Sequence, residues 1–239
     1  MPECIHGLEI PLCDSCYPKA IPDKPKVVRA SSRAPRVTSV SATKKSLTTA
    51  AQRVYHVTHI NNLEEILATG ALVADASPAV NLSTDLTREL RSTAQVSAGG
   101  PMVSDFVCFY LTPSATLWEQ LREGADDETR WSTAARTASS ADFVFLVSTV
   151  EALGGGSVIA DGDAAHSLTR FATGDSLTRM LERLHDSDDV QEAEALAVGP
   201  VSFESVQLIG VSNDKVRDRV KKLTSVKVVV HPPWFQGAE

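Results

Sequence analysis

Two glutamates in the last quarter of the chain have a spacing that suits catalysis. Glu192 and Glu194 lie in residues 189–198, a strand-like run that follows a charged, loop-like stretch. Alternate residues of a strand point to the same face, so both carboxylates are expected on one side of a sheet. Such a face is favoured where it lines a wet or functional cleft. A carboxylate placed there can stabilise developing positive charge or accept a proton.

His56 and Thr58 are placed where they could contact an anionic ligand. They alternate in the strand-like run 54–58 and therefore share one face. Asn61 follows and is expected to cap a helix, with Glu64 three residues on completing a capping box. Free N–H groups at the start of a helix favour anions such as a pyrophosphate. A ligand contact and a purely structural histidine both remain open from position alone.

Arg88 and Arg91 share one face of a short predicted helix over residues 84–94. Leu86 and Leu90 are expected on its buried side. Taken alone, two helix arginines are most often solvated charges, so their meaning depends on what the fold brings near them.

The first 18 residues contain a cluster of zinc-type ligands. Cys13 and Cys16 form a C-x-x-C knuckle, and Cys4 and His6 supply one further sulfur and one nitrogen. Four such ligands suit a tetrahedral structural zinc, and a segment this short would fold only around the metal. Unpaired thiols or a disulfide are the alternative. Residues 19–50 follow, and their proline, serine and basic residues are typical of a linker.

Charge is distributed unevenly along the 239 residues, whose net charge is −7. Residues 1–50 hold eight Lys/Arg against four Asp/Glu, a balance of +4, and the remaining residues hold 15 against 26, a balance of −11. An acidic body is not typical of a generic duplex-DNA binder, although the basic leader could attract phosphates. Since neither a long apolar run nor a signal peptide is evident, we expect a cytoplasmic protein without membrane contact.

Short strands with a few peripheral helices predict an α+β domain over residues 53–236. No dinucleotide-binding glycine motif, phosphate-binding loop or G-x-S-x-G elbow is present. Strands are expected at 54–58, 106–111, 143–147, 193–198, 206–211 and 226–230, and helices at 61–70, 84–94, 177–184 and 214–223.

An ordered set of motifs resembles the DarT family, bacterial toxins that ADP-ribosylate bases of single-stranded DNA. The set is Y-H-V-T-H-I-N-N-L at 55–63, Arg91, Gly99-Gly100, D-F-V-C-F-Y at 105–110 and Glu192-Ala193-Glu194, with a further family-like segment at 161–171. The resemblance implies an ADP-ribosyltransferase core of two facing antiparallel sheets around an NAD cleft. Departures include Cys108, where the family has proline, and Glu192, where many relatives have glutamine or alanine.

The resemblance also implies roles for individual residues. Glu194 and Arg91 match the catalytic glutamate and arginine, and His56 matches a residue that contacts NAD. The expected cofactor-binding set is His56, Thr58, Asn62, Arg91 and Tyr110. Trp118 or Tyr110 would be an aromatic platform for an unstacked base.

The implied reaction is transfer of ADP-ribose from NAD to thymine or guanine in single-stranded DNA. The resemblance further implies a toxin with a macrodomain-type antitoxin as its partner. Two alternatives stay open. The E-x-E arrangement of Glu192 and Glu194 also matches arginine-modifying protein ADP-ribosyltransferases, and a catalytically inactive binding module is the third possibility.

Overall fold

The computed structural model describes residues 49–74, 76–124, 127–187 and 189–236. The predicted zinc ligands Cys4, His6, Cys13 and Cys16, and the linker up to residue 48, lie outside the described residues. Within that described part of the chain, no helix is long and apolar enough to cross a membrane.

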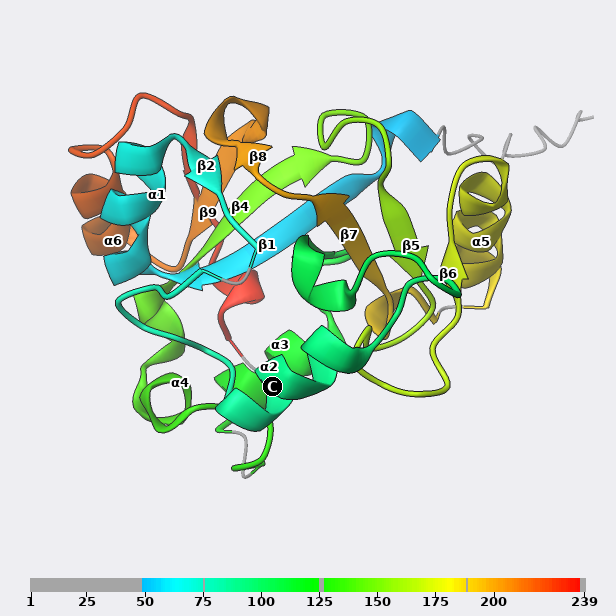
Figure 1. The fold of residues 1–239 in the computed structure, drawn as a ribbon. Helices are drawn as coiled ribbons and strands as arrows, with labels where there is room; N and C mark the ends of the chain where they lie inside the picture. Colours follow the sequence, from blue (N-terminus) through cyan, green and yellow to red (C-terminus); the bar gives the residue numbers. More distant parts are fainter. Residues whose placement is uncertain (1–48, 75, 125–126, 188, 237–239) are drawn as a thin grey trace, which may run out of the picture. The chain divides into compact units, whose positions relative to one another are not determined.

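The fold is built on a large mixed sheet (Figure 1). Its eight strands run in the order β10-β9-β4-β1-β3-β7-β5-β6, and β2 and β8 form a separate antiparallel pair. The strands are β1 Arg53–His59, β2 Ala71–Leu72, β3 Phe106–Tyr110, β4 Phe143–Thr149, β5 Val158–Ala160, β6 Phe171–Ala172, β7 Glu194–Val198, β8 Val201–Ser202, β9 Leu208–Val211 and β10 Val228–Val230.

The expectation of two separate antiparallel sheets needs correction. The eight strands are continuous, and β9 and β10 are parallel. The sheet nevertheless has a seam, because β1 and β3 are joined at the single pair Tyr55↔Tyr110, whereas β1 pairs with β4 along its whole length. One half therefore contains β10, β9, β4 and β1, and the other contains β3, β7, β5 and β6.

Six α-helices surround the sheet in the described residues. They are α1 Leu63–Thr69, α2 Asp85–Thr93, α3 Thr116–Arg122, α4 Thr133–Thr137, α5 Asp175–Asp186 and α6 Asp214–Val220. Figure 1 shows α5 beside β5 and β6, and α6 at the opposite side of the molecule near β9 and β10. Helix α5 buries Leu177, Leu181 and Leu184, whose helical spacing places them on one side.

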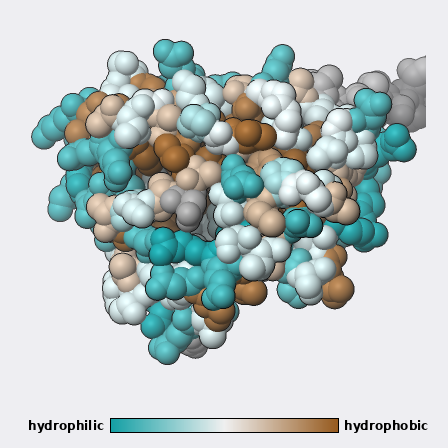
Figure 2. Space-filling view, in the orientation of Figure 1, coloured by the Kyte–Doolittle hydropathy of each residue, from teal (hydrophilic) through white to brown (hydrophobic). Residues whose placement is uncertain are grey.

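Two large clusters of buried residues hold the elements together. The larger is mainly aliphatic and includes Val54, Leu146 and Ile209 from the central strands with the leucines of α5. The second is aromatic, and Trp118 and Phe145 lie at its centre. Figure 2 shows brown apolar residues above the middle of the visible face, with teal hydrophilic residues across the middle below them and at the sides.

Trp118 is not available as a stacking platform for a base. Its side chain is 1% exposed, it packs edge-on against Phe143 and Phe145, and its Nε1–H donates to the Trp234 carbonyl at 2.7 Å. The sequence-based assignment of Trp118 to the acceptor site is therefore wrong, because the tertiary packing uses it as a core residue.

Two details of the helices also differ from expectation. Leu86 and Leu90 of α2 are each 48% exposed, whereas Thr87 is buried, because the Thr87 hydroxyl donates to the Arg130 carbonyl. Helix α1 begins after Asn62 rather than Asn61, and Asn62 makes no side-chain cap bond there. Its amide is used elsewhere, as described below.

Candidate active site

A cleft of about 450 Å³ opens along the seam of the sheet. The six residues predicted for catalysis and cofactor binding all line it, although they come from β1, the start of α1, α2, β3 and β7. They are His56, Thr58, Asn62, Arg91, Tyr110 and Glu194. The fold therefore brings together residues that are up to 138 positions apart in the chain.

Glu194 begins β7 and is nearly inaccessible, with 3% of its surface exposed. Its Oε2 accepts a hydrogen bond from the Ala164 amide at 3.1 Å and lies 3.8 Å from Arg91 Nη2. Burial raises the pKa of the Glu194 carboxyl, and the nearby Asp163 charge raises it further, while Arg91 opposes the shift. The carboxylate is thus more basic than an ordinary glutamate.

Arg91 extends from α2 toward Glu194 and also contacts the Cys108 sulfur of β3. Burial opposes its charge, but Cys108, Glu194 and Asp163 outweigh that effect and raise the pKa of the guanidinium. For the Cys108 thiol, burial acts in the other direction and raises the pKa to about 12, so at neutral pH the sulfur is protonated. Arg91 is a permanent cation held at the base of the cleft.

His56 presents a neutral imidazole. Its Nδ1 lies 2.9 Å from the Cys108 carbonyl, and because a carbonyl oxygen only accepts, Nδ1 carries the proton. Burial lowers the pKa of His56, against the opposing effect of that hydrogen bond. The other ring nitrogen, Nε2, is left as an acceptor.

Asn62 is engaged by the protein itself. Its side-chain amide donates to Thr58 Oγ1 at 3.1 Å and to the Val80 carbonyl at 2.9 Å, and its Oδ1 accepts from the Val80 amide at 2.8 Å. The two bonds with Val80 fix the segment 76–82, several residues of which line the cleft. Thr58 is held in place by the same amide.

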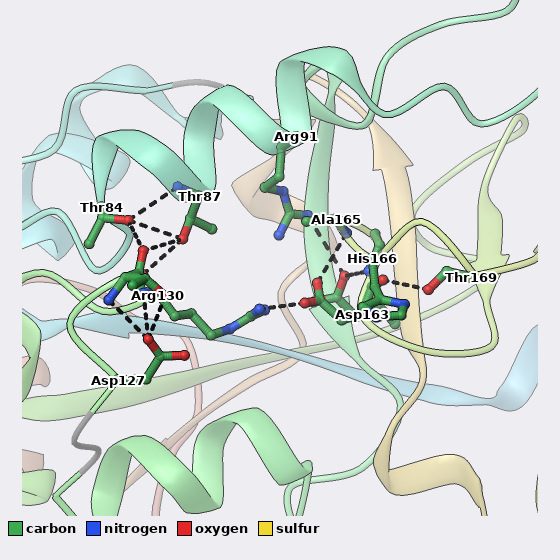
Figure 3. Close-up of polar contacts among 12 residues, drawn as sticks. Thr84, Thr87, Arg91, Asp127, Arg130, Asp163, Ala165, His166 and Thr169 are labelled. Carbon is green, nitrogen blue, oxygen red and sulfur yellow. Dashed lines mark hydrogen bonds and ion pairs between the residues drawn. The ribbon is translucent and has the colours of Figure 1, made fainter.

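The structure adds two charged residues that the site prediction missed. Arg130 forms an ion pair with Asp163, and Arg130 also lines the cleft (Figure 3). Asp163 lies in the segment 161–171, whose resemblance to the family could have indicated that it belongs to the site. No sequence feature pointed to Arg130, because residues 122–141 are polar and show no periodicity.

Four buried nitrogen atoms in the described residues make no hydrogen bond, and two of them belong to residues of the cleft wall. These two are Arg130 Nε and Trp131 Nε1; the others are on Arg122 and Arg136. A buried N–H without a partner is costly, so the pair at Arg130 and Trp131 suits an acceptor supplied by a ligand.

Glu192 does not share the strand with Glu194. A 3-10 turn, Asp189–Gln191, precedes it, and β7 begins only at Glu194. Glu192 is exposed, accepts from Thr116 Oγ1 at 2.6 Å and is not among the residues that line the cleft. The premise of two acids on one strand face is therefore wrong.

Metal binding finds no support within the described residues. No group of three or more His, Cys, Asp or Glu side chains there could hold a metal ion. The zinc prediction concerns Cys4, His6, Cys13 and Cys16, which lie outside these residues.

Several solved structures have a similar fold. DarT of Thermus sp. 2.9 in complex with ADP-ribosylated ssDNA has a TM-score of 0.66 and 21% identity, over 77% of this chain and 96% of that one. The same protein in complex with NAD+ has a TM-score of 0.63 and 23% sequence identity, over 77% of this chain and 98% of that one. DarTG of Thermosipho africanus in complex with ADP-ribose has a TM-score of 0.58 and 20% sequence identity, over 77% of this chain and 51% of that one. No curated protein matches by sequence.

Residues 55–236 match the family model described as DarT, ssDNA thymidine ADP-ribosyltransferase, and the chain belongs to that family. It is accordingly an NAD-dependent ADP-ribosyltransferase that acts on single-stranded DNA. The family and the activity predicted from the sequence are confirmed, as is the α+β class of the fold.

Proposed function

We propose that this enzyme transfers ADP-ribose from NAD to thymidine in single-stranded DNA, with Glu194 and Arg91 as its catalytic residues. The observation that carries the proposal is the buried Arg91–Glu194 pair at the seam of the sheet, inside a cleft lined by every residue that was predicted to bind NAD. Of the two bases left open by the sequence, thymine is favoured because the family description names thymidine.

The chemistry follows from the two side chains. The bond between nicotinamide and ribose C1 breaks, nicotinamide leaves with the bonding electrons, and positive charge develops on the ribose. The Glu194 carboxylate stabilises that charge, and its raised pKa suits it to accept the proton that the base nitrogen loses as it bonds to C1. Arg91 orients Glu194, and its fork of donors can hold a pyrophosphate oxygen at the same time.

The donor side of the cleft is formed by β1 and β3. His56 offers Nε2 as an acceptor for an amide or hydroxyl donor of NAD, and Thr58 and Tyr110 supply further polar contacts. Asn62 acts indirectly, because its amide is committed to Thr58 and Val80. It is thus a positioning residue for the segment 76–82.

The acceptor strand would use the donors at Arg130 and Trp131. Their unpaired N–H groups suit carbonyl or phosphate oxygens of a nucleotide. We further propose that residues 53–236 are the catalytic domain and that the basic segment 19–50 adds affinity for DNA phosphates. Zinc at Cys4, His6, Cys13 and Cys16 stays a prediction, which metal analysis of the purified chain would check.

A transferase that modifies DNA bases is harmful to its own cell. Because a DarTG protein is among the structures of the same fold, we propose that this chain is the toxin of a toxin–antitoxin pair. Its antitoxin would be a macrodomain-type hydrolase that removes the modification.

The test is intact-mass measurement of short single-stranded oligonucleotides, each containing one reactive base type, after incubation with the enzyme and NAD. The expected result is a gain of one ADP-ribose on the thymidine oligonucleotide, lost in Glu194→Gln and retained in Glu192→Gln. Modification of guanine alone would overturn the choice of base. NAD consumption without any gain on DNA would overturn the choice of acceptor.

A further inference from the structure

Asp163 lies in a loop that is closed on itself beside the catalytic glutamate. Its Oδ1 accepts from the Ala165 amide at 3.0 Å, and its carbonyl accepts from the His166 amide at 2.9 Å and the Thr169 hydroxyl at 2.6 Å. The next residue, Ala164, is fully buried and donates its amide to Glu194. The position of that amide therefore depends on how Asp163 holds the loop.

Arg130 connects the same loop to helix α2 (Figure 3). Its guanidinium is paired with Asp163, and its carbonyl accepts from the Thr87 hydroxyl at 3.1 Å. Thr87 lies one helical turn before Arg91. The contacts thus close a ring from Thr87 through Arg130 and Asp163 to Ala164 and Glu194, and back through Arg91 to α2.

We propose that Asp163 is a positioning residue for the transfer reaction: bound to Arg130, it holds the Ala164 amide against Glu194 and so fixes the carboxylate opposite Arg91. The proposal rests on the roles assigned to Glu194 and Arg91 above. It extends them to a residue that is not among those lining the cleft.

The charge of Asp163 also acts on Glu194. Five groups surround that carboxyl: Arg91 from α2, Arg130 and Asp163 from two loops, and Cys108 and Tyr110 from β3. Asp163 raises the pKa of Glu194, whereas Arg91, the Ala164 amide and Arg130 lower it. Removing the Asp163 charge should therefore lower the pKa of Glu194, whereas weakening the Ala164 bond alone should raise it.

The experiment is a pH profile of ADP-ribose transfer for Asp163→Asn, at saturating NAD and oligonucleotide. Asparagine keeps an oxygen for the Ala165 amide but cannot pair with Arg130 by charge. We expect kcat to fall by about 10- to 100-fold with little change in the KM for NAD, since small misplacement of a catalytic group has effects of this size. The acidic limb of the profile should move to lower pH.

Asp161→Asn is the matched control. Asp161 lies in the same segment but is paired with Arg170 and Arg183, and it is not among the groups that act on Glu194. Asp161→Asn should have the wild-type kcat, and the acidic limb of its pH profile should lie at the wild-type pH. Thermal melting of both variants checks that they are folded.

A second pair of variants keeps the proposal testable if Asp163→Asn does not fold. Thr169→Val removes one loop bond without changing charge, so kcat should fall, and the weaker Ala164 bond should move the limb to higher pH, opposite to the shift in Asp163→Asn. Arg130→Gln removes a cation that lowers the pKa of Glu194, so its limb should move to higher pH.

The outcomes separate this inference from the proposed function. If Glu194→Gln is inactive but Asp163→Asn matches Asp161→Asn in both kcat and limb, Asp163 does not position Glu194. If Glu194→Gln is active, the assignment of the catalytic glutamate itself fails.

Discussion

Tyr110 and Glu194 stand directly opposite each other across the antiparallel pair β3–β7. Directly opposite residues of such a pair project from the same face, so the phenol and the carboxylate lie side by side in the cleft. Tyr110 also pairs with Tyr55 of β1 and so sits at the seam of the sheet. Burial, with the Glu194 charge adding to it, raises the pKa of Tyr110, and the phenol stays protonated as a hydrogen-bond donor.

Replacing Glu194 should remove activity without removing the fold. Glu194→Gln keeps the shape but cannot stabilise positive charge or accept the proton, and we expect transfer to fall by at least about 10²-fold. Glu192→Gln is the control, because Glu192 is exposed and bound to Thr116. Oligonucleotide mass measures both. Equal activity of the two variants would contradict the assignment.

Arg91 should not be replaceable by lysine. Lysine retains the charge, but its ammonium lacks the planar fork of donors with which the guanidinium can contact Glu194 and hold a pyrophosphate oxygen at the same time. We expect Arg91→Lys to lose about 10- to 100-fold in kcat. Arg88→Lys, three residues away and paired with Asp85, should remain active. Single-turnover transfer rates decide between these outcomes.

Activity should be lost on the acidic side at a higher pH than an ordinary glutamate would give. The reaction needs the carboxylate form of Glu194, and a raised pKa means that this form is protonated earlier as pH falls. His56 should add no limb near neutrality, because its pKa is lowered and it stays neutral there. Initial rates across pH test this, and a limb at or below the usual glutamate range would contradict it.

Gly210 should be intolerant of any side chain. A Cβ at this position would lie 2.4 Å from Cζ3 of the Trp234 ring and 3.4 Å from the Phe145 Cβ. Gly210→Ala should therefore destabilise the protein by about 1–3 kcal/mol through overpacking. Gly155→Ala, where no atom lies within 4 Å, is the control. Urea unfolding measures both, and equal stability of the two variants would show that the aromatic cluster can relax.

Cys108 should be a poor nucleophile in the folded protein. Burial raises its pKa to about 12, so the reactive thiolate is scarce at neutral pH. Alkylation of the peptide that contains Cys108, followed by mass spectrometry, should be slow in the native state and fast in denaturant. Bound NAD should slow it further, since Cys108 lines the cleft. Rapid native labelling would contradict the raised pKa of the thiol.

Hydrophobic periodicity identified several of the strands and helices that carry the site, but it missed some of the shorter elements packed around them. The strands near 54–58, 106–111 and 143–147 and the helices near 84–94 and 177–184 are present because long apolar runs and helical spacing are strong signals. The short strands β5 and β6 and helix α3 were missed. A strand of two or three residues is too short to show a detectable period.

The candidate site was predictable from the family-like motifs and not from residue patterns alone. His56, Arg91 and Glu194 are each ordinary in isolation, and they converge only because β1, α2 and β7 meet at one cleft. Arg130 was not predictable, since it acts through a contact with a loop 33 residues away. The assignment of Glu192 to the same strand face was wrong because β7 begins only at Glu194, two residues after Glu192.

Because β1 and β3 are joined at a single residue pair, a bound substrate could stabilise the connection between the two halves of the sheet. His56 belongs to one half of the sheet and Glu194 to the other, and the backbone joins the halves at a single rung. A dinucleotide lying across the cleft would contact both halves and so link them non-covalently. Tight binding would then make the two halves unfold as one cooperative unit, so that the enzyme is most rigid when it is loaded to react.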